Sequence, residues 1–177
     1  MSGFLQSSLS ADRYLEAVSR ERSSYSGFNL LVFDGKELYH LNSERQPQLV
    51  EPGLHGLSNA DLDSCGWPKV DSARKKLQYW LEQPGSMEDL TLLLNSKALA
   101  SPETLPNTGV DPLEEHRLSA EFIAMDGYGT RCSTGLVWKQ DQIKLSEINY
   151  DIDGRIVGQV EFQIRLKERV CFSTTAS

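Results

Sequence analysis

The last third of the chain has the pattern of β-strands joined by short turns. Segments 121–124, 130–138, 143–150 and 156–166 are separated by turns that contain Gly or Asp. In the last of them four apolar residues alternate with polar ones: Val160, Phe162, Ile164 and Leu166. A period of two is typical of a strand with one face in water. Because short turns join antiparallel neighbours, this region predicts an antiparallel sheet.

The N-terminal part combines a helix with a hairpin. Ser10 is a suitable N-cap for a helix that runs to about residue 22. Residues 28–33 are apolar at every position except Asn29, which predicts a central strand covered on both faces. Asp34-Gly35 is typical of a two-residue hairpin turn, with the returning strand at 36–41.

Helical patterns occupy the middle of the chain. Residues 69–83 form an amphipathic pattern, with Val70 and Leu81 on its apolar face. Ser86 and Asp89 resemble a capping box at the start of a short second helix. Antiparallel hairpins on either side of a block of helices indicate the α+β class.

Composition excludes several kinds of function. The 177-residue chain is 39% hydrophobic, carries a net charge of −7 and has no stretch of about 18 apolar residues, so we expect no membrane span. It has no cluster of Lys and Arg, which argues against a nucleic-acid partner. Without a secretory signal at the N-terminus, we expect a cytoplasmic location with reduced thiols. Three cysteines without C-x-x-C spacing and three scattered histidines predict neither a metal site nor a cofactor.

Three polar blocks together carry a resemblance: SGFNLLV at 26–32, HGLSNADLDSCGWPKV at 55–70 and GYGTRCST at 127–134. With them the chain resembles the Asn-Arg-Asp-Glu (NRDE) family, also called the transport and Golgi organisation 2 family, from about residue 4 to residue 164. The resemblance implies a four-layer αββα sandwich of antiparallel sheets, as in the N-terminal-nucleophile hydrolases.

Two hallmarks of that family have no counterpart here. Its members begin Met-Cys and then carry the Asn-Arg-Asp-Glu motif, whereas this chain begins Met1-Ser2-Gly3 and contains no such motif. We therefore expect residues 1–166 to be the C-terminal part of a single family domain, with an incomplete sandwich. We expect residues 167–177 to be a disordered or frayed tail.

Asn59 and Arg131 are the candidate catalytic residues. An Asn in a Gly- and Ser-rich turn can donate its side-chain N–H to a developing oxyanion, or it can simply cap the turn. The resemblance favours the first role for Asn59, because an Asn serves the oxyanion hole in cysteine-type N-terminal-nucleophile amidases. Arg131, at the start of a strand, can orient a carboxylate or form a structural ion pair. In related choloylglycine-hydrolase-like enzymes, an Arg from a late strand lines the nucleophile.

Ser58, Trp67 and Tyr128 are the candidate ligand-binding residues. Trp67 is expected to pack either in the core or in a pocket wall, and Tyr128, between two glycines, either lines a cleft or packs a turn. Cys132 is expected to be a small buried residue rather than a nucleophile. Cys65 is the expected exposed thiol.

Three functions stay open at this point. The full-length protein could be an amide hydrolase of the N-terminal-nucleophile type, with this chain inactive because the expected nucleophile is missing. The alternative is a non-catalytic carrier of a small ligand, haem or lipid, linked to the secretory pathway or lipid homeostasis. The third is a non-functional fragment. For the first two we expect a small apolar or amide-containing ligand, and Asn59 and Arg131 in one cleft.

Overall fold

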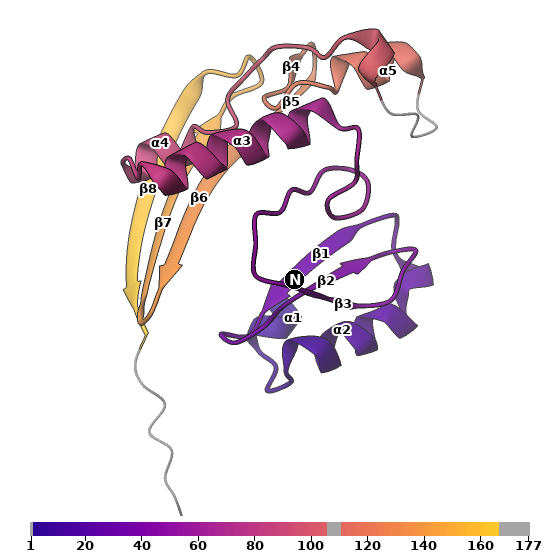
Figure 1. Ribbon diagram of the computed structural model, residues 1–177, viewed down its shortest axis with the longest axis vertical. Helices are drawn as coiled ribbons and strands as arrows, with labels where there is room; N and C mark the ends of the chain where they lie inside the picture. The colour runs from indigo at the N-terminus through magenta and orange to yellow at the C-terminus, as the bar shows by residue number, and fades with distance from the viewer. Residues whose placement is uncertain (1, 106–110, 167–177) are drawn as a thin grey trace, which may run out of the picture. The chain divides into compact units, whose positions relative to one another are not determined.

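The computed structural model describes residues 2–105 and 111–166 of the chain. They fall into two compact units, Met1–Cys65 (unit 1) and Gly66–Ser177 (unit 2), and each is described by itself. Both units combine helices with antiparallel sheets, as the α+β prediction requires (Figure 1). The predicted tail at residues 167–177 lies outside the described residues.

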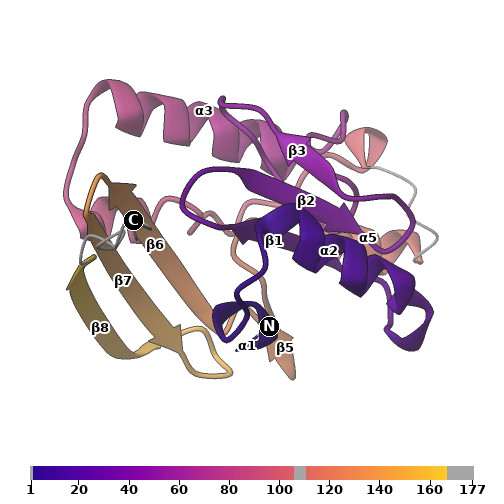
Figure 2. The same ribbon diagram turned by 90° about the horizontal axis from the view of Figure 1, so that it is seen from below.

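Unit 1 is a three-stranded antiparallel sheet with a helix across one face. Its elements are α1 (Ser2–Leu5), α2 (Ala11–Arg20), a 3₁₀ turn (Arg22–Ser24), β1 (Asn29–Phe33), β2 (Leu38–Asn42) and β3 (Gln48–Val50). The strand order is β1-β2-β3, and α2 packs against β1 and β2 (Figure 2). Ser10 occupies the N-cap position of α2 as predicted, but its side chain makes no capping hydrogen bond; the carboxylate of Asp34 accepts the N–H of Ala11 instead. Ala11, Leu15, Val32 and Leu41 form the core beneath the helix.

Two predictions for unit 1 are wrong. β1 is an edge strand of the described sheet and not a central one, and within unit 1 only its face toward α2 is covered, with Leu31 43% exposed and Phe33 38% exposed. The hairpin loop has four residues, 34–37, because Phe33 pairs with Leu38. Its geometry follows from Asp34, whose carboxylate accepts the N–H groups of Lys36 and Glu37 and so closes a wider turn.

Unit 2 contains the remaining elements. They are α3 (Pro68–Glu82), α4 (Met87–Thr91), a 3₁₀ turn (Pro102–Thr104), α5 (Pro112–Arg117), β4 (Ala124–Met125), β5 (Tyr128–Gly129), β6 (Cys132–Lys139), β7 (Gln142–Tyr150) and β8 (Ile156–Arg165). β4 and β5 form a small hairpin, so of the strand predicted at 121–124 only Ala124 is in a strand. The capping box of α4 is formed by Ser86 and Asp89 as predicted, whereas Leu81 of α3 is 57% exposed rather than packed.

The sheet β6-β7-β8 is covered by a helix on one face. α4 packs against β6 and β7 (Figure 1), and a Cβ atom added to Gly135 would lie 2.7 Å from Thr91 Oγ1. Glycine therefore allows the closest approach of helix and sheet. The opposite face carries apolar side chains that pair across the strands and stay exposed: Leu136, Trp138, Phe162 and Ile164.

Candidate functional site

A polar pocket of about 690 Å³ lies in unit 1 where the hairpin β1–β2 meets the loop at residues 58–61. The hairpin and the loop both line the pocket mostly with side chains that carry an amide, a hydroxyl or a charge. The lining residues are Gly27, Phe28, Asn29, Asn42, Ser43, Glu44, Arg45, Ser58, Asn59, Ala60, Asp61 and Ser64. The predicted site residues Ser58 and Asn59 are therefore together in one pocket.

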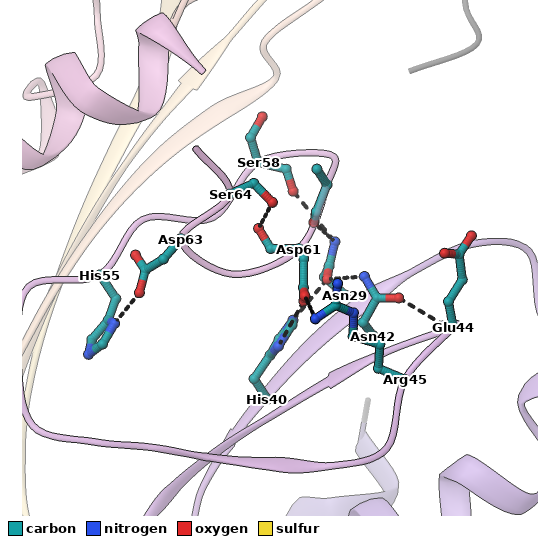
Figure 3. Close-up of polar contacts among 11 residues, drawn as sticks. Asn29, His40, Asn42, Glu44, Arg45, His55, Ser58, Asp61, Asp63 and Ser64 are labelled. Atoms are coloured by element: carbon teal, nitrogen blue, oxygen red, sulfur yellow. Dashed lines mark hydrogen bonds and ion pairs between the residues drawn. The ribbon is translucent and has the colours of Figure 1, made fainter. Parts of the chain in front are cut away.

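Asp63 closes the base of the loop that carries Ser58 and Asn59. Its carboxylate accepts the N–H of Gly56 at 2.9 Å and contacts Nδ1 of His55 at 2.6 Å, and its own N–H donates to the carbonyl of Gly56 at 2.8 Å (Figure 3). The backbone of Asp63 has a positive φ of 55°, a left-handed conformation that Asp tolerates better than most residues. The loop is thus tied at both ends.

Asn29 holds the middle of the same loop. Its Nδ2 donates to the carbonyl of Ala60 at 2.8 Å and to that of Ser58 at 3.5 Å. Its Oδ1 accepts from Asn42 Nδ2 at 3.1 Å and lies 2.8 Å from His40 Nε2 (Figure 3). One side chain at the start of β1 therefore joins β2 to the loop.

His40 and Arg45 hold the far end of the loop through Asp61. Arg45 forms an ion pair of 2.7 Å with Asp61 Oδ2, and His40 Nδ1 lies 3.7 Å from Oδ1 of the same carboxylate. His40 is only 2% exposed. Burial lowers its pKa; the Asp61 carboxylate opposes this and Arg45 reinforces it, so the net shift is downward. A neutral ring with its proton on Nε2 satisfies the acceptor Oδ1 of Asn29.

The side chains of the predicted site residues Ser58 and Asn59 take no part in these hydrogen bonds and ion pairs. In the described part of the chain, neither the side-chain amide of Asn59 nor the hydroxyl of Ser58 has a hydrogen-bond partner. Several other polar side chains of the wall point to one another or to the backbone, as Figure 3 shows for Asn29, Asn42 and Asp61, whereas the carboxylate of Glu44 points away from them. Asn59 is exposed and Ser58 half-buried, so both side chains are accessible from solvent on a loop whose backbone is held in place.

The other predicted site residues belong to unit 2. Arg131 is exposed, and its carbonyl accepts the N–H of Tyr150 at 2.9 Å, just before β6 begins. Tyr128 is 58% exposed and borders a depression of about 660 Å³ with Arg117 and Met125. Trp67 is 5% exposed, with the Lys69 ammonium 5.3 Å from its ring centroid, so it packs in the core. A common cleft for Asn59 and Arg131 stays a prediction.

The cysteines differ from expectation in one respect. Cys65 is exposed as predicted, but Cys132 is exposed too, because the outer face of β6 is open. Cys171 lies outside the described residues. Within residues 2–105 and 111–166, no group of three or more His, Cys, Asp or Glu side chains is placed to hold a metal ion.

Sequence reasoning did not identify the supporting residues of the pocket. One signal was present for Asn29, which is the lone polar residue in an otherwise apolar strand. Such a residue needs a buried hydrogen-bond partner. No comparable signal marks His40, Arg45 or Asp61, whose roles depend on contacts between segments distant in sequence.

The comparisons with known proteins agree with the three sequence blocks. The model of the family described as Transport and Golgi organisation 2 matches residues 1–151. The chain belongs to this family. A bovine (Bos taurus) Transport and Golgi organization protein 2 homolog is 28% identical over 154 residues, 78% of this chain and 55% of the relative. A mouse (Mus musculus) Transport and Golgi organization 2 homolog is 27% identical over 150 residues, 76% of this chain and 54% of the relative.

The chain thus spans about half the length of the curated relatives it matches. No solved structure matches it. Among the described residues, the helices are too short or too polar to cross a membrane.

Proposed function

We propose that this part of a Transport and Golgi organisation 2 family protein binds a small amide-containing ligand at Ser58 and Asn59, and that it does so without catalysis. One observation carries the proposal: both side chains lack partners, on a loop that Asn29, Asp61 and Asp63 hold in place. The Asn side chain offers both a donor and an acceptor, which complement the two polar atoms of an amide.

An adjacent apolar groove supports a ligand with a hydrocarbon part. This groove, of about 550 Å³, is bordered by Phe4, Tyr14 and Val18 and shares Phe28 and Asn29 with the polar pocket. An amide head at Asn59 therefore leaves a hydrocarbon chain next to apolar side chains, where burial stabilises it by roughly 25 cal/mol per Å². A ligand of this kind fits a carrier function linked to lipid homeostasis in the cytoplasm.

Haem is the less favoured ligand. An axial ligand for haem iron is commonly the ring nitrogen of a His. Both ring nitrogens of His40 face Asn29 and Asp61, and those of His55 face Glu51 and Asp63. Iron coordination by either ring would break a contact that supports the loop.

The arrangement around the pocket also favours binding over hydrolysis. A catalytic Ser or Cys needs a base at about 2.6–3.2 Å. The hydroxyl of Ser64 donates to the carbonyl of Asp61, and that of Ser43 accepts the N–H of Phe28. The buried imidazole of His40 is directed at Asn29 and Asp61. If the full-length protein is an amidase, Asn59 would be its oxyanion donor, with Arg131 in the same cleft.

For the whole chain we propose an incomplete αββα sandwich formed as one domain over residues 1–166. In each unit a helix covers one face of a sheet and the other face exposes apolar side chains, as at Leu31 in unit 1 and Phe162 in unit 2. Two sheets of this kind can bury their open faces against each other, with the helices outside.

Calorimetric titration with N-octanoylglycine tests the binding proposal, with octanoate as the probe that lacks the amide. We expect N-octanoylglycine to bind more tightly than octanoate. Asn59→Ala should weaken binding of N-octanoylglycine about tenfold, the effect of one or two hydrogen bonds, and leave octanoate unchanged. The control is Asn95→Ala, an exposed amide in unit 2. Equal affinities of wild type and Asn59→Ala for N-octanoylglycine would refute the proposal.

A further inference from the structure

We infer that Asn29 is a positioning residue for the ligand site, acting through the loop that carries Ser58 and Asn59. The inference rests on the proposed function, because it concerns how the same two side chains are presented. Asn29 does not need to touch the ligand for this role. It fixes the backbone on both sides of Asn59 by donating to the carbonyls of Ser58 and Ala60.

The orientation of the Asn29 amide follows from its partners. Asn42 Nδ2 carries only hydrogens to donate, so the atom of Asn29 that faces it, 3.1 Å away, must be the acceptor Oδ1. The carbonyls of Ser58 and Ala60 only accept, so Nδ2 must face them. Both ends of the amide are thus matched to their surroundings, and an isosteric Asp would not be.

The Asp variant therefore isolates the positioning role. Asn29→Asp keeps the size of the side chain and its acceptors for Asn42 and His40, but replaces the donor by a second carboxylate oxygen. That oxygen would face two carbonyl oxygens, a repulsive contact between acceptors. The expected result is release of the 58–60 backbone from β1, while α2 and the core at Leu15 and Leu41 stay packed.

A double-mutant cycle on N-octanoylglycine binding distinguishes this role from a general structural one. Asn29→Asp should weaken binding about as much as Asn59→Ala, roughly tenfold. In the Asn59→Ala background, Asn29→Asp should have a clearly smaller effect than in wild type, since only Ser58 is then left for Asn29 to position. Octanoate affinity should not change. If Asn59→Ala weakens binding and Asn29→Asp does not, or if the two effects multiply, the inference fails while the proposed function stands. If Asn59→Ala has no effect, the proposed function itself fails.

Two controls keep the inference testable if a variant is unstable. Leu15→Val removes core volume from α2 at a residue that lines neither the polar pocket nor the apolar groove, and its affinity for N-octanoylglycine should equal that of wild type below its melting temperature. Asn29→Ala replaces Asn29→Asp if the latter does not fold. In the wild-type protein, the Nδ2 hydrogens of Asn29 should exchange with solvent at least about tenfold more slowly than those of Asn59. Equal exchange rates would overturn the inference whatever the variants show.

Discussion

At the scale of single residues, His40 is the buried group whose charge matters most to the loop. It is almost completely buried between Asn29 and Asp61, and burial, with Arg45 adding to it, holds its pKa below the ordinary value of 6.5 despite the nearby carboxylate. The unfolded chain therefore binds a proton at a higher pH than the folded chain does. The stability associated with neutral His40 is complete above about pH 6.5 and is lost as the pH falls through the folded pKa.

Urea unfolding between pH 7.5 and pH 5 measures this effect. We expect the free energy of unfolding of wild type to decrease with falling pH more steeply than that of His40→Gln, whose side chain does not titrate. If the free energies of unfolding of the two proteins depend on pH in the same way, protonation of His40 does not cause the loss of stability at low pH. Asn59→Ala is a suitable second reference, because Asn59 has no titratable group and belongs to the loop that carries Asp61, the partner of His40.

Sequence reasoning placed two candidate residues, Ser58 and Asn59, on the loop that lines the pocket, but it did not find the residues that support this loop. Asn59 and Ser58 were identified because a polar turn with a family resemblance is recognisable in one segment. Arg45 and Asp61 form their ion pair across 16 positions of sequence, and His40 meets Asn29 only through the register of β1 and β2. Such contacts depend on strand pairing and loop path, which a local pattern does not encode.

At the scale of elements, the contact between α4 and β6 depends on one glycine. A Cβ on Gly135 would lie 2.7 Å from Thr91 Oγ1 and 3.2 Å from Thr91 N, and Thr91 is buried. We expect Gly135→Ala to destabilise the protein by about 1–3 kcal/mol, because the helix must move away from the sheet. Gly158→Ala in β8 is the control, since nothing lies within 4 Å of its added Cβ. Urea denaturation should separate the two variants; equal stabilities would contradict the close approach.

Sequence patterns predict where helices and strands lie better than they predict which faces of these elements are covered. Turns that contain Gly or Asp separated the segments of β6, β7 and β8, alternation of apolar residues marked β8, and Ser10 and Ser86 located the starts of α2 and α4. The apolar segment that became β1 suggested a strand covered on both faces, but β1 is an edge strand of the described sheet. Composition alone cannot distinguish a covered face from one that is exposed in the described chain, since both require apolar residues.

At the scale of the whole molecule, the proposed sandwich requires that the open sheet faces be buried against each other. Leu31→Lys in unit 1 and Phe162→Lys in unit 2 place a charge on each face. In a sandwich each should cost about 2–3 kcal/mol of unfolding free energy, and the double variant should deviate from additivity. If the faces are exposed to solvent, each change should stay within about 0.5 kcal/mol and the effects should add. Chemical denaturation of the four proteins decides between these outcomes.

The most direct test of the binding site is a ¹H–¹⁵N NMR titration of the 177-residue protein with N-octanoylglycine. Our account predicts that the largest shift changes occur at the backbone of Ser58 and Ala60 and at the side-chain amide of Asn59. The backbone amide of Phe28 should show smaller shift changes, because Phe28 lies where the polar pocket adjoins the apolar groove. Shift changes centred instead on Tyr128, or none at saturating ligand, would contradict the central claim that the braced loop of unit 1 is the binding site.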